Sequence, residues 1–500
     1  MRHSTKLFIL CVSMAGLYTF LFHGVGIGIN LLLFEAAVVA TWLSLRRVPA
    51  SRLSILSVGG MLLTAAMVAL HGSTMTIVAN LISVGFTVGV LLAPGMNALH
   101  RAAVASLVHL WAVPMALVRS SPFLRGRTTG GGSWATGLLK ASVVPLFLLA
   151  FAGMYRMSNP YFDGFMDHVL AIFNRLDTAL IGSFLVGLLA SGYLLLSTRS
   201  AALSRWTAPR SDLLQAWPEV ADGQFIRSEI RMATVLLAGL NLLLLAANVL
   251  DIRYVWLDFK FNGQYLKQFV HEGTYMLLLS IVLGAAIVLY FFRGDLNFHK
   301  GNRMLKLLCY AWLGQNMVLA LSVGMRNYWY IHYYALAYKR IGVVFFLLAL
   351  LISLVLVLVK VKRGRSVHFL MRTSTAAAYC MVLLMSLFNW DGLIAKYNMA
   401  QAGRAFVHLD FLATLSDKAL PYLVQPHGKL ELIATGNARL ISGAEGYSWT
   451  KYMTPEEFGA IIENRSDRFL HAWPRRSWKE WNWAEARAFQ RLGFMGGKGQ

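Results

Sequence analysis

The sequence predicts an all-α, polytopic transmembrane helical bundle followed by a small helical domain outside the membrane. Apolar residues make up 57% of the chain and charged residues only 14%, a composition that excludes an ordinary soluble protein. Apolar runs of about twenty residues recur, the length at which a helix spans about 30 Å of hydrocarbon. Since backbone groups in lipid must be bonded within the chain, these runs are expected to be helices. The short alternating segments of a transmembrane barrel are absent from the sequence.

About eleven runs are expected to cross the membrane within a transmembrane domain over residues 1–390. The first follows MRHSTK, which resembles the start of a signal peptide. No small-residue cleavage site follows, so we expect it to remain as an anchor. The expected spans are 7–22, 29–45, 53–71, 75–94, 138–156, 178–197, 229–250, 273–292, 304–324, 341–359 and 369–389.

Residues 95–137 are predicted to lie at the cytoplasmic interface rather than to cross the membrane. The segment has an apolar face, is interrupted by Pro114 and becomes polar toward its end. These properties are typical of a helix lying in the plane of the membrane surface.

The net charge of +23 is distributed unevenly along the chain. From Asp391 onward, fourteen Lys and Arg face eleven Asp and Glu, so +20 of the charge belongs to the membrane part. Its cations follow every second span, which favours the positive-inside rule over nucleic-acid binding. The pattern predicts a cytoplasmic N-terminus, a periplasmic tail and anionic phospholipid headgroups as partners. These connections hold Arg46, Arg47, Arg52, Arg101, Arg119, Arg199, Arg205, Arg293, Arg303, Lys360, Lys362, Arg363 and Arg365, among others.

The tail, residues 391–500, is predicted to be a small helical domain. Thr454 and Glu457 form the pattern of a capping box, and so do Ser477 and Glu480. Its tryptophans fit a small core or a dock onto the membrane face, and the tail is the expected contact for envelope proteins.

Glu35 is the one acid well inside an apolar run. An ionisable group in lipid indicates a functional site with a partner. A protonated or paired glutamate that fixes helix packing is the equal alternative. Asn241 and Asn248 lie seven residues apart, hence on one helix face, and are expected to bond helices together. A cation site is their second interpretation.

The stretch 325–340, MRNYWYIHYYALAYKR, combines six tyrosines and tryptophans with three Lys and Arg and no acid. Read as an outward interfacial helix, it places Arg326, Tyr330, Tyr333 and Arg340 on one side. Together with Tyr334 and Glu35, these are the candidate ligand-facing residues. The cations require an internal acid, for which Glu35 is a candidate, or an external anion such as a lipid phosphate. A cytoplasmic position of the stretch is the third possibility.

Several positions resemble the signatures of an uncharacterised family of bacterial polytopic membrane proteins, over roughly residues 225–425. Arg326, Tyr330, Tyr334, Leu336 and Arg340 match "R-x3-Y-x3-Y-G-L-T-x2-R", although Ala335 and Ala337 replace its Gly and Thr. Lys418 stands where the family has Asp. The resemblance implies a bacterial inner-membrane location and no established activity. The remaining matching positions are Asn241, Gly273, Asn389, Asp391, Asn398, Ser416, Asp417 and Pro421.

The sequence shows no catalytic, metal-binding or cofactor-binding motif, so we expect no metal and no cofactor. The leading hypothesis is a non-enzymatic scaffold, sensor or assembly partner of the inner membrane. A transporter or lipid-handling protein for an anionic substrate is the first alternative. A membrane-embedded transferase that uses a lipid-linked substrate is the second.

Overall fold

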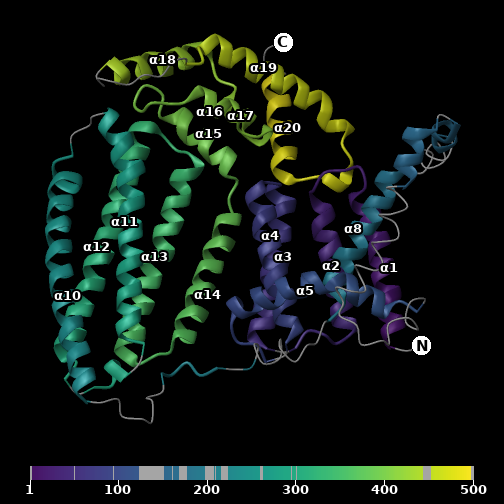
Figure 1. The fold of residues 1–500 in the computed structure, drawn as a ribbon. Coiled ribbons are helices and arrows are strands. Elements are labelled where there is room, and N and C mark those ends of the chain that lie inside the picture. Colours follow the sequence, from purple (N-terminus) through teal and green to yellow (C-terminus); the bar gives the residue numbers. More distant parts are fainter. Residues whose placement is uncertain are drawn as a thin grey trace.

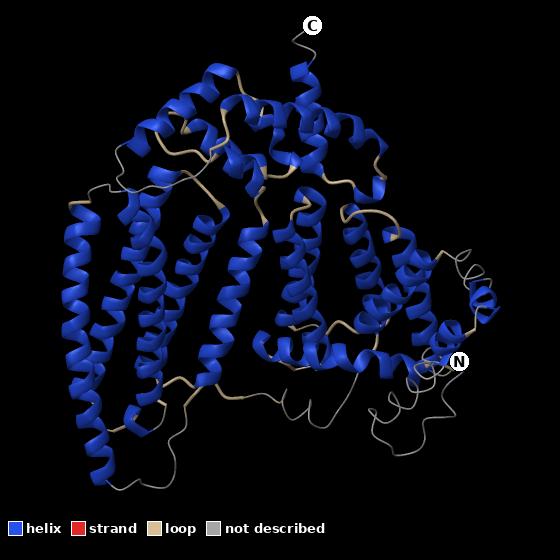
Figure 2. Ribbon diagram, turned by 45° about the horizontal axis from the view of Figure 1, so that its top comes forward, coloured by secondary structure: helices blue, strands red, loops and turns tan. Residues whose placement is uncertain are grey.

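A computed structural model of the chain is helical throughout its described residues (Figures 1 and 2). The helices form two membrane bundles, and a layer of tail helices covers one end of both. The described residues are 3–49, 51–93, 95–122, 151–159, 161–167, 177–197, 208, 210–214, 223–259, 263–293, 295–299, 301–442 and 452–496.

The N-terminal bundle is built from apolar helices whose ends are fixed by small polar residues. Ser51 and Ser73 accept hydrogen bonds from backbone amides at the starts of two helices, and Asp177 does so at a third. Such caps satisfy amides that a helix start leaves unbonded. The bundle contains α1 (His3–Phe22), α2 (Ile29–Ser44), α3 (Arg52–His71), α4 (Thr74–Leu92) and α8 (Thr178–Leu195).

The helix α5 (Leu99–Ser120) lies across the end of this bundle that faces away from the tail (Figures 1 and 2). Pro114 is inside it. Its length and apolarity alone would let it cross a membrane, but its direction differs from that of its neighbours. The interfacial position predicted for residues 95–137 stays a prediction, and residues 123–137 lie outside the described chain.

The C-terminal bundle is held together by apolar packing and by buried amides. Asn241 Nδ2 donates to the Leu308 carbonyl at 3.1 Å, and Asn248 Nδ2 donates to the Gln315 carbonyl at 3.1 Å. These bonds join α10 to α12, the interhelical role expected from the spacing of the two asparagines. The bundle contains α10 (Gly223–Asp251) with a π-helical extension (Ile252–Leu257), α11 (Gly263–Phe291), α12 (Arg303–Tyr334), α13 (Tyr338–Arg363) and α14 (Val367–Ser386).

The two bundles meet through α14. Tyr379 Oη donates to Ser83 Oγ on α4 at 2.9 Å. A Cβ at Gly60 would lie 2.3 Å from the same tyrosine oxygen, so only glycine leaves room for this contact. The junction is therefore specific, although fewer residues form it than form either bundle.

Within the described residues, nine helices are long and apolar enough to cross a membrane. One of the nine is α5, and two shorter apolar helices, Ile29–Ser44 and Tyr275–Phe291, add to them. The structure thus places a helix at ten of the eleven expected spans. The remaining one, 138–156, lies mostly outside the described residues.

The tail consists of short helices that pack against the membrane bundles. The predicted capping boxes at Thr454 with Glu457 and at Ser477 with Glu480 are confirmed. Its apolar core also includes Ala335 and Ile341 from the junction of α12 and α13. The tail therefore shares a core with the membrane part. Its helices are α15 (Trp390–Ala400), α16 (Leu409–Ala413), α17 (Leu420–Leu423), α18 (His427–Ser442), α19 (Pro455–Ala472) and α20 (Trp483–Gly496).

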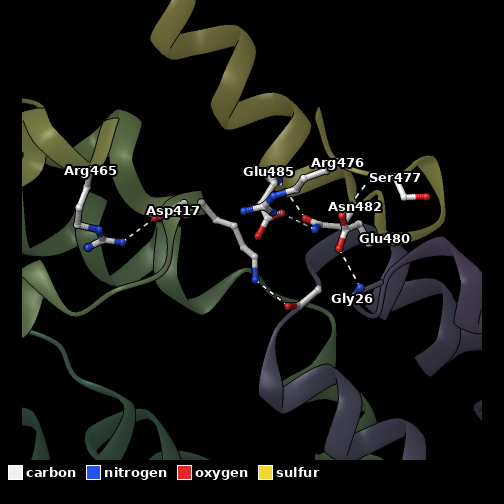
Figure 3. Close-up of polar contacts among 10 residues, drawn as sticks. Gly26, Asp417, Arg465, Arg476, Ser477, Glu480, Asn482 and Glu485 are labelled. Carbon is white, nitrogen blue, oxygen red and sulfur yellow. Dashed lines mark hydrogen bonds and ion pairs between the residues drawn. The ribbon is translucent and has the colours of Figure 1, made fainter. Parts of the chain in front are cut away.

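The tail also binds two loops of the N-terminal bundle (Figure 3). Gly26 N donates to Glu480 Oε2 at 2.8 Å, and Ile29 N donates to the Trp481 carbonyl at 3.0 Å. Lys418 Nζ donates to the carbonyl of Gly72, in the loop between α3 and α4, at 2.8 Å. These contacts connect one end of the N-terminal bundle to the layer that also packs on the C-terminal bundle.

Candidate functional site

Glu35 is almost completely buried in the N-terminal bundle. It lies six residues into α2, roughly 9 Å from the start of the helix, and its side chain is 3% exposed. Asn80 on α4 is its polar neighbour. Oε2 of the carboxyl accepts no hydrogen bond from any described residue. Such a buried unbonded oxygen costs about 1–3 kcal/mol and indicates a place for a further donor.

The carboxyl of Glu35 lies in the wall of a cavity of about 910 Å³. Its volume is within the range of small-molecule and cofactor sites, roughly 300–1,000 Å³. Leu81 and Leu107 in its wall are 64% and 61% exposed, so the cavity opens to the surface of the bundle. The lining residues come from α1, α2, α3, α4, α5 and α8 and include Tyr18, Phe34, Met61, Ile82, Val84, Phe86, Leu110 and Leu194.

A few polar groups interrupt the apolar walls of the cavity. Asn80 Nδ2 lies 3.3 Å from Thr64 Oγ1 and 3.4 Å from the Met61 carbonyl. Ser106 on α5 hydrogen-bonds Tyr193 Oη on α8. Apolar walls with a few fixed polar groups suit an amphipathic ligand, whose polar part these groups would orient.

Glu35 makes no ion pair with a described cation, so the predicted pairing of Glu35 with Arg326 or Arg340 is wrong. Arg326 instead pairs with Asp251 at 2.5 Å, and both side chains are largely buried. The sequence reasoning missed Asp251 because the expected span ended at residue 250. The helix in fact continues through Asp251 and then as a π-helix to Leu257, which carries the carboxylate to the level of Arg326.

The prediction that residues 325–340 form one interfacial helix is also wrong. The helix α12 ends at Tyr334, and α13 begins at Tyr338. Ala335 between them has φ +60° and ψ −163°, a conformation that favours glycine. The chain therefore turns back, and Arg326 and Arg340 do not share the continuous helical face expected for them.

Arg340 contacts the end of the preceding helix. Its Nη1 donates to the carbonyls of Tyr334 and Ala335, and its guanidinium lies 4.3 Å from the centre of the Tyr330 ring. Tyr333 packs against Trp329 and Phe259, and Tyr334 is buried against Phe406. Among the described residues, these contacts lie at or near the junction of α12, α13 and the tail.

The positions that resemble family signatures are found mainly at the same junction. Asn398 bonds both backbone groups of Leu336, accepting at 2.8 Å and donating at 2.9 Å. Asp391 accepts hydrogen bonds from the hydroxyls of Tyr338 and Ser416. Asn389 caps α15, Asp417 pairs with Arg465 at 2.7 Å, and Pro421 lies in the first turn of α17. Gly273 lies in α11, in a stretch whose side-chain surroundings are not described.

The described residues contain no group of three or more His, Cys, Asp and Glu side chains that could hold a metal ion. They do place the Glu35 cavity in one bundle and a polar junction in the other. The cavity could not be found from the sequence, because its walls come from six helices that are distant along the chain.

Long apolar helices in two bundles, with polar side chains bonded between helices, define an integral, multi-pass membrane protein. The model of a family described as "Domain of unknown function (DUF4153)" matches residues 31–425, and the chain belongs to this family. The match confirms the resemblance and extends it toward the N-terminus, where it includes Glu35 and most of the cavity. No curated protein and no solved structure matches the chain.

Proposed function

We propose that this membrane protein binds a lipid in the cavity of its N-terminal bundle. The carrying observation is that Glu35, whose Oε2 accepts no hydrogen bond from a described residue, is one of the residues that line an apolar cavity of about 910 Å³. This is the lipid-handling hypothesis with Glu35 kept as the ligand-facing residue and the face formed by Arg326 and Arg340 left out.

The chemistry of the site assigns a role to each part of the ligand. Lipid tails are as apolar as the cavity walls, so a hydrocarbon chain that enters from the bilayer gains little from the walls alone. A hydrogen bond to Glu35 in this low-dielectric setting distinguishes one lipid from another. The expected ligand is therefore an amphipathic lipid with a hydroxyl or amide group below its headgroup, since either group can bond the carboxyl.

The orientation of the protein is part of the proposal. The helix ends away from the tail carry the cations predicted to be cytoplasmic, including Arg47 after α2 and Lys360, Lys362 and Arg363 at the end of α13. By the positive-inside rule this end faces the cytoplasm of a bacterial cell and the tail faces the periplasm. We expect a membrane-impermeant reagent to label a cysteine introduced in spheroplasts at Thr435, an exposed position on α18.

Native mass spectrometry of the purified full-length protein tests the proposal. Gly85 lines the cavity, and a Cβ there would lie 3.6 Å from Ser106 Oγ. Gly85→Leu should fill part of the cavity and reduce the lipid retained after purification, and Glu35→Leu should change which lipid is retained. The matched control is Gly59→Leu, because a Cβ at Gly59 on α3 meets nothing within 4 Å. The same amount of lipid in Gly85→Leu as in the wild type, together with the same lipid species in Glu35→Leu, would overturn the proposal.

The scaffold hypothesis has separate support in the docking of the tail. The tail bonds the loops at Gly26 and Gly72 and shares a core with Ala335 and Ile341, so it bridges both bundles. Rapid disulfide formation between cysteines introduced at Gly26 and Glu480 in intact membranes would support a fixed bridge. Failure of these cysteines to cross-link would contradict it.

A further inference from the structure

A second pocket, of about 310 Å³, lies where the membrane helices meet the tail. It is formed by the end of α14, by α15 and α17, and by α20 from the far end of the sequence. Its lining residues include Leu387, Phe388, Lys396, Lys418, Arg487 and Arg491.

The charged residues that line this pocket are all cations. Lys396, Lys418, Arg487 and Arg491 line it, and none of its lining residues is acidic. Lys396, Arg487 and Arg491 form no ion pair with a carboxylate in the described part of the chain. Three of the four cations of the pocket therefore have no ion-pair partner in the described part of the chain, whereas Glu485, Asp391 and Asp417 act on Lys418.

The acids nearest to the pocket are bonded to other groups (Figure 3). Glu485 pairs with Arg476 at 2.8 Å and accepts from Asn482 at 2.9 Å. Asp417 pairs with Arg465. Burial lowers the pKa of Lys418, although Glu485 is the first of the acids that oppose this shift. A bound anion would relieve the unfavourable burial of this ammonium group.

Aromatic rings support the two arginines of α20. Arg487 lies 4.9 Å from the centre of the Trp483 ring, and Arg491 donates to Tyr422 Oη at 2.7 Å. A guanidinium that rests on a ring keeps its N–H edge available, and this edge matches the oxygens of a phosphate.

The position of the pocket selects a lipid over a soluble anion. The apolar helix α14 ends at Ser386, and Leu387, Phe388 and Leu393 at the rim of the pocket are 38%, 42% and 42% exposed. Apolar side chains at this level face the boundary between hydrocarbon and headgroups.

We propose that this pocket binds the phosphate of an anionic phospholipid, with Lys396, Lys418, Arg487 and Arg491 around the phosphate and the acyl chains along Leu387 and Phe388. The proposal concerns a different site from the Glu35 cavity and does not depend on it.

The test compares two double variants of the full-length protein in lipid nanodiscs. Lys396→Gln with Arg487→Gln removes two exposed cations from the pocket. Lys429→Gln with Arg468→Gln, on α18 and α19, removes the same charge outside its lining. Native mass spectrometry reports the binding of phosphatidylglycerol against phosphatidylcholine. We expect the pocket variant to bind phosphatidylglycerol about tenfold or more weakly, since each lost charged hydrogen bond contributes at least that factor. The control should keep the wild-type preference.

If both double variants lost phosphatidylglycerol binding equally, the effect would be one of net charge alone, and the proposal would be overturned. A second arm adds inorganic phosphate to protein in phosphatidylcholine nanodiscs and follows thermal unfolding. Stabilisation by phosphate without any preference for phosphatidylglycerol would overturn the lipid source. Gly85→Leu should leave the preference for phosphatidylglycerol unchanged, so failure of the cavity proposal and failure of this one give different results.

Discussion

The two membrane bundles differ in whether their buried acid forms an ion pair. In the C-terminal bundle, Asp251 pairs with Arg326 at 2.5 Å and joins α10 to α12. In the N-terminal bundle, Glu35 has no ion-pair partner among the described residues, and it is one of the residues that line a cavity of about 910 Å³. A paired acid contributes to helix packing, whereas an unpaired acid beside a cavity is available to a ligand. The difference supports the proposal that the N-terminal bundle binds a ligand and that the acid of the C-terminal bundle is structural.

The largest expected effect comes from removing one charge of the buried pair. Asp251→Asn removes the carboxylate that pairs with the buried Arg326 and should lower the free energy of unfolding by about 3–5 kcal/mol. Glu35→Gln is the matched change in the other bundle and should cost less than about 1 kcal/mol, since it breaks no ion pair. Thermal unfolding in detergent micelles measures both.

The double variant Asp251→Leu with Arg326→Leu serves as the control, because it removes both charges together. It should recover much of the stability lost in Asp251→Asn. Equal losses for Asp251→Asn and Glu35→Gln would remove the contrast between the bundles.

The next effect depends on pH and concerns the junction between the C-terminal bundle and the tail. Burial, followed by repulsion from Arg340, lowers the pKa of His408 to about 4 from its ordinary value of 6.5. The unfolded chain therefore binds a proton at a higher pH than the folded chain. The contribution of the neutral His408 to the free energy of unfolding is fully present above pH 6.5. It falls by up to about 1.4 kcal/mol per pH unit as the pH decreases toward 4. His408→Gln should flatten the difference in stability between pH 7 and pH 5, and an unchanged pH profile would contradict this.

A substitution in the turn between α12 and α13 is expected to raise the free energy of unfolding, by a smaller amount. Ala335 is held at φ +60° and ψ −163°, at a cost of about 1–3 kcal/mol for a residue with a Cβ. Ala335→Gly removes this strain and loses one buried methyl group, worth about 0.8 kcal/mol. The net expectation is a gain of about 1 kcal/mol in the free energy of unfolding. Ala337 has an extended backbone at φ −148°, so Ala337→Gly should bring no gain; equal effects of the two changes would argue against strain at residue 335.

The smallest effect compares two buried asparagines. Asn248→Leu removes a hydrogen bond between α10 and α12 and should cost about 0.6 kcal/mol. Asn80→Leu in the N-terminal bundle should cost a similar amount and also alter lipid retention, because Asn80 lines the cavity. Lipid retention that changes equally in the two variants would contradict the assignment of binding to one bundle.

Much of the helix pattern could be predicted because apolar runs in lipid leave the backbone no other structure. The bounds of α3, α4 and α14 lie close to the expected spans, and both tail capping boxes follow from local residue types. Glu35 could be singled out because a lone acid in an apolar run is costly. The surroundings of Glu35 could not be predicted, because they depend on which helices pack against one another.

The turn at Ala335 was missed for a related reason. The residues 325–340 fit a helix locally, and alanine favours one. The contacts that impose the turn come from Asn398, sixty-two residues away from Leu336, and from the tail core. The resemblance carried the relevant signal, because the family signature has Gly where this chain has Ala335.

Labelling with a hydrophobic carbodiimide, which enters the bilayer and modifies protonated carboxyl groups, tests the assignment of binding to the N-terminal bundle most directly. Purified protein would be treated in nanodiscs, and peptide mass spectrometry would locate the adduct. We predict modification of Glu35 but not of Asp251, a loss of this modification in Gly85→Leu and its retention in Gly59→Leu. Absence of labelling at Glu35, or equal labelling in both glycine variants, would show that the carboxyl does not face an accessible cavity and would contradict the proposed function.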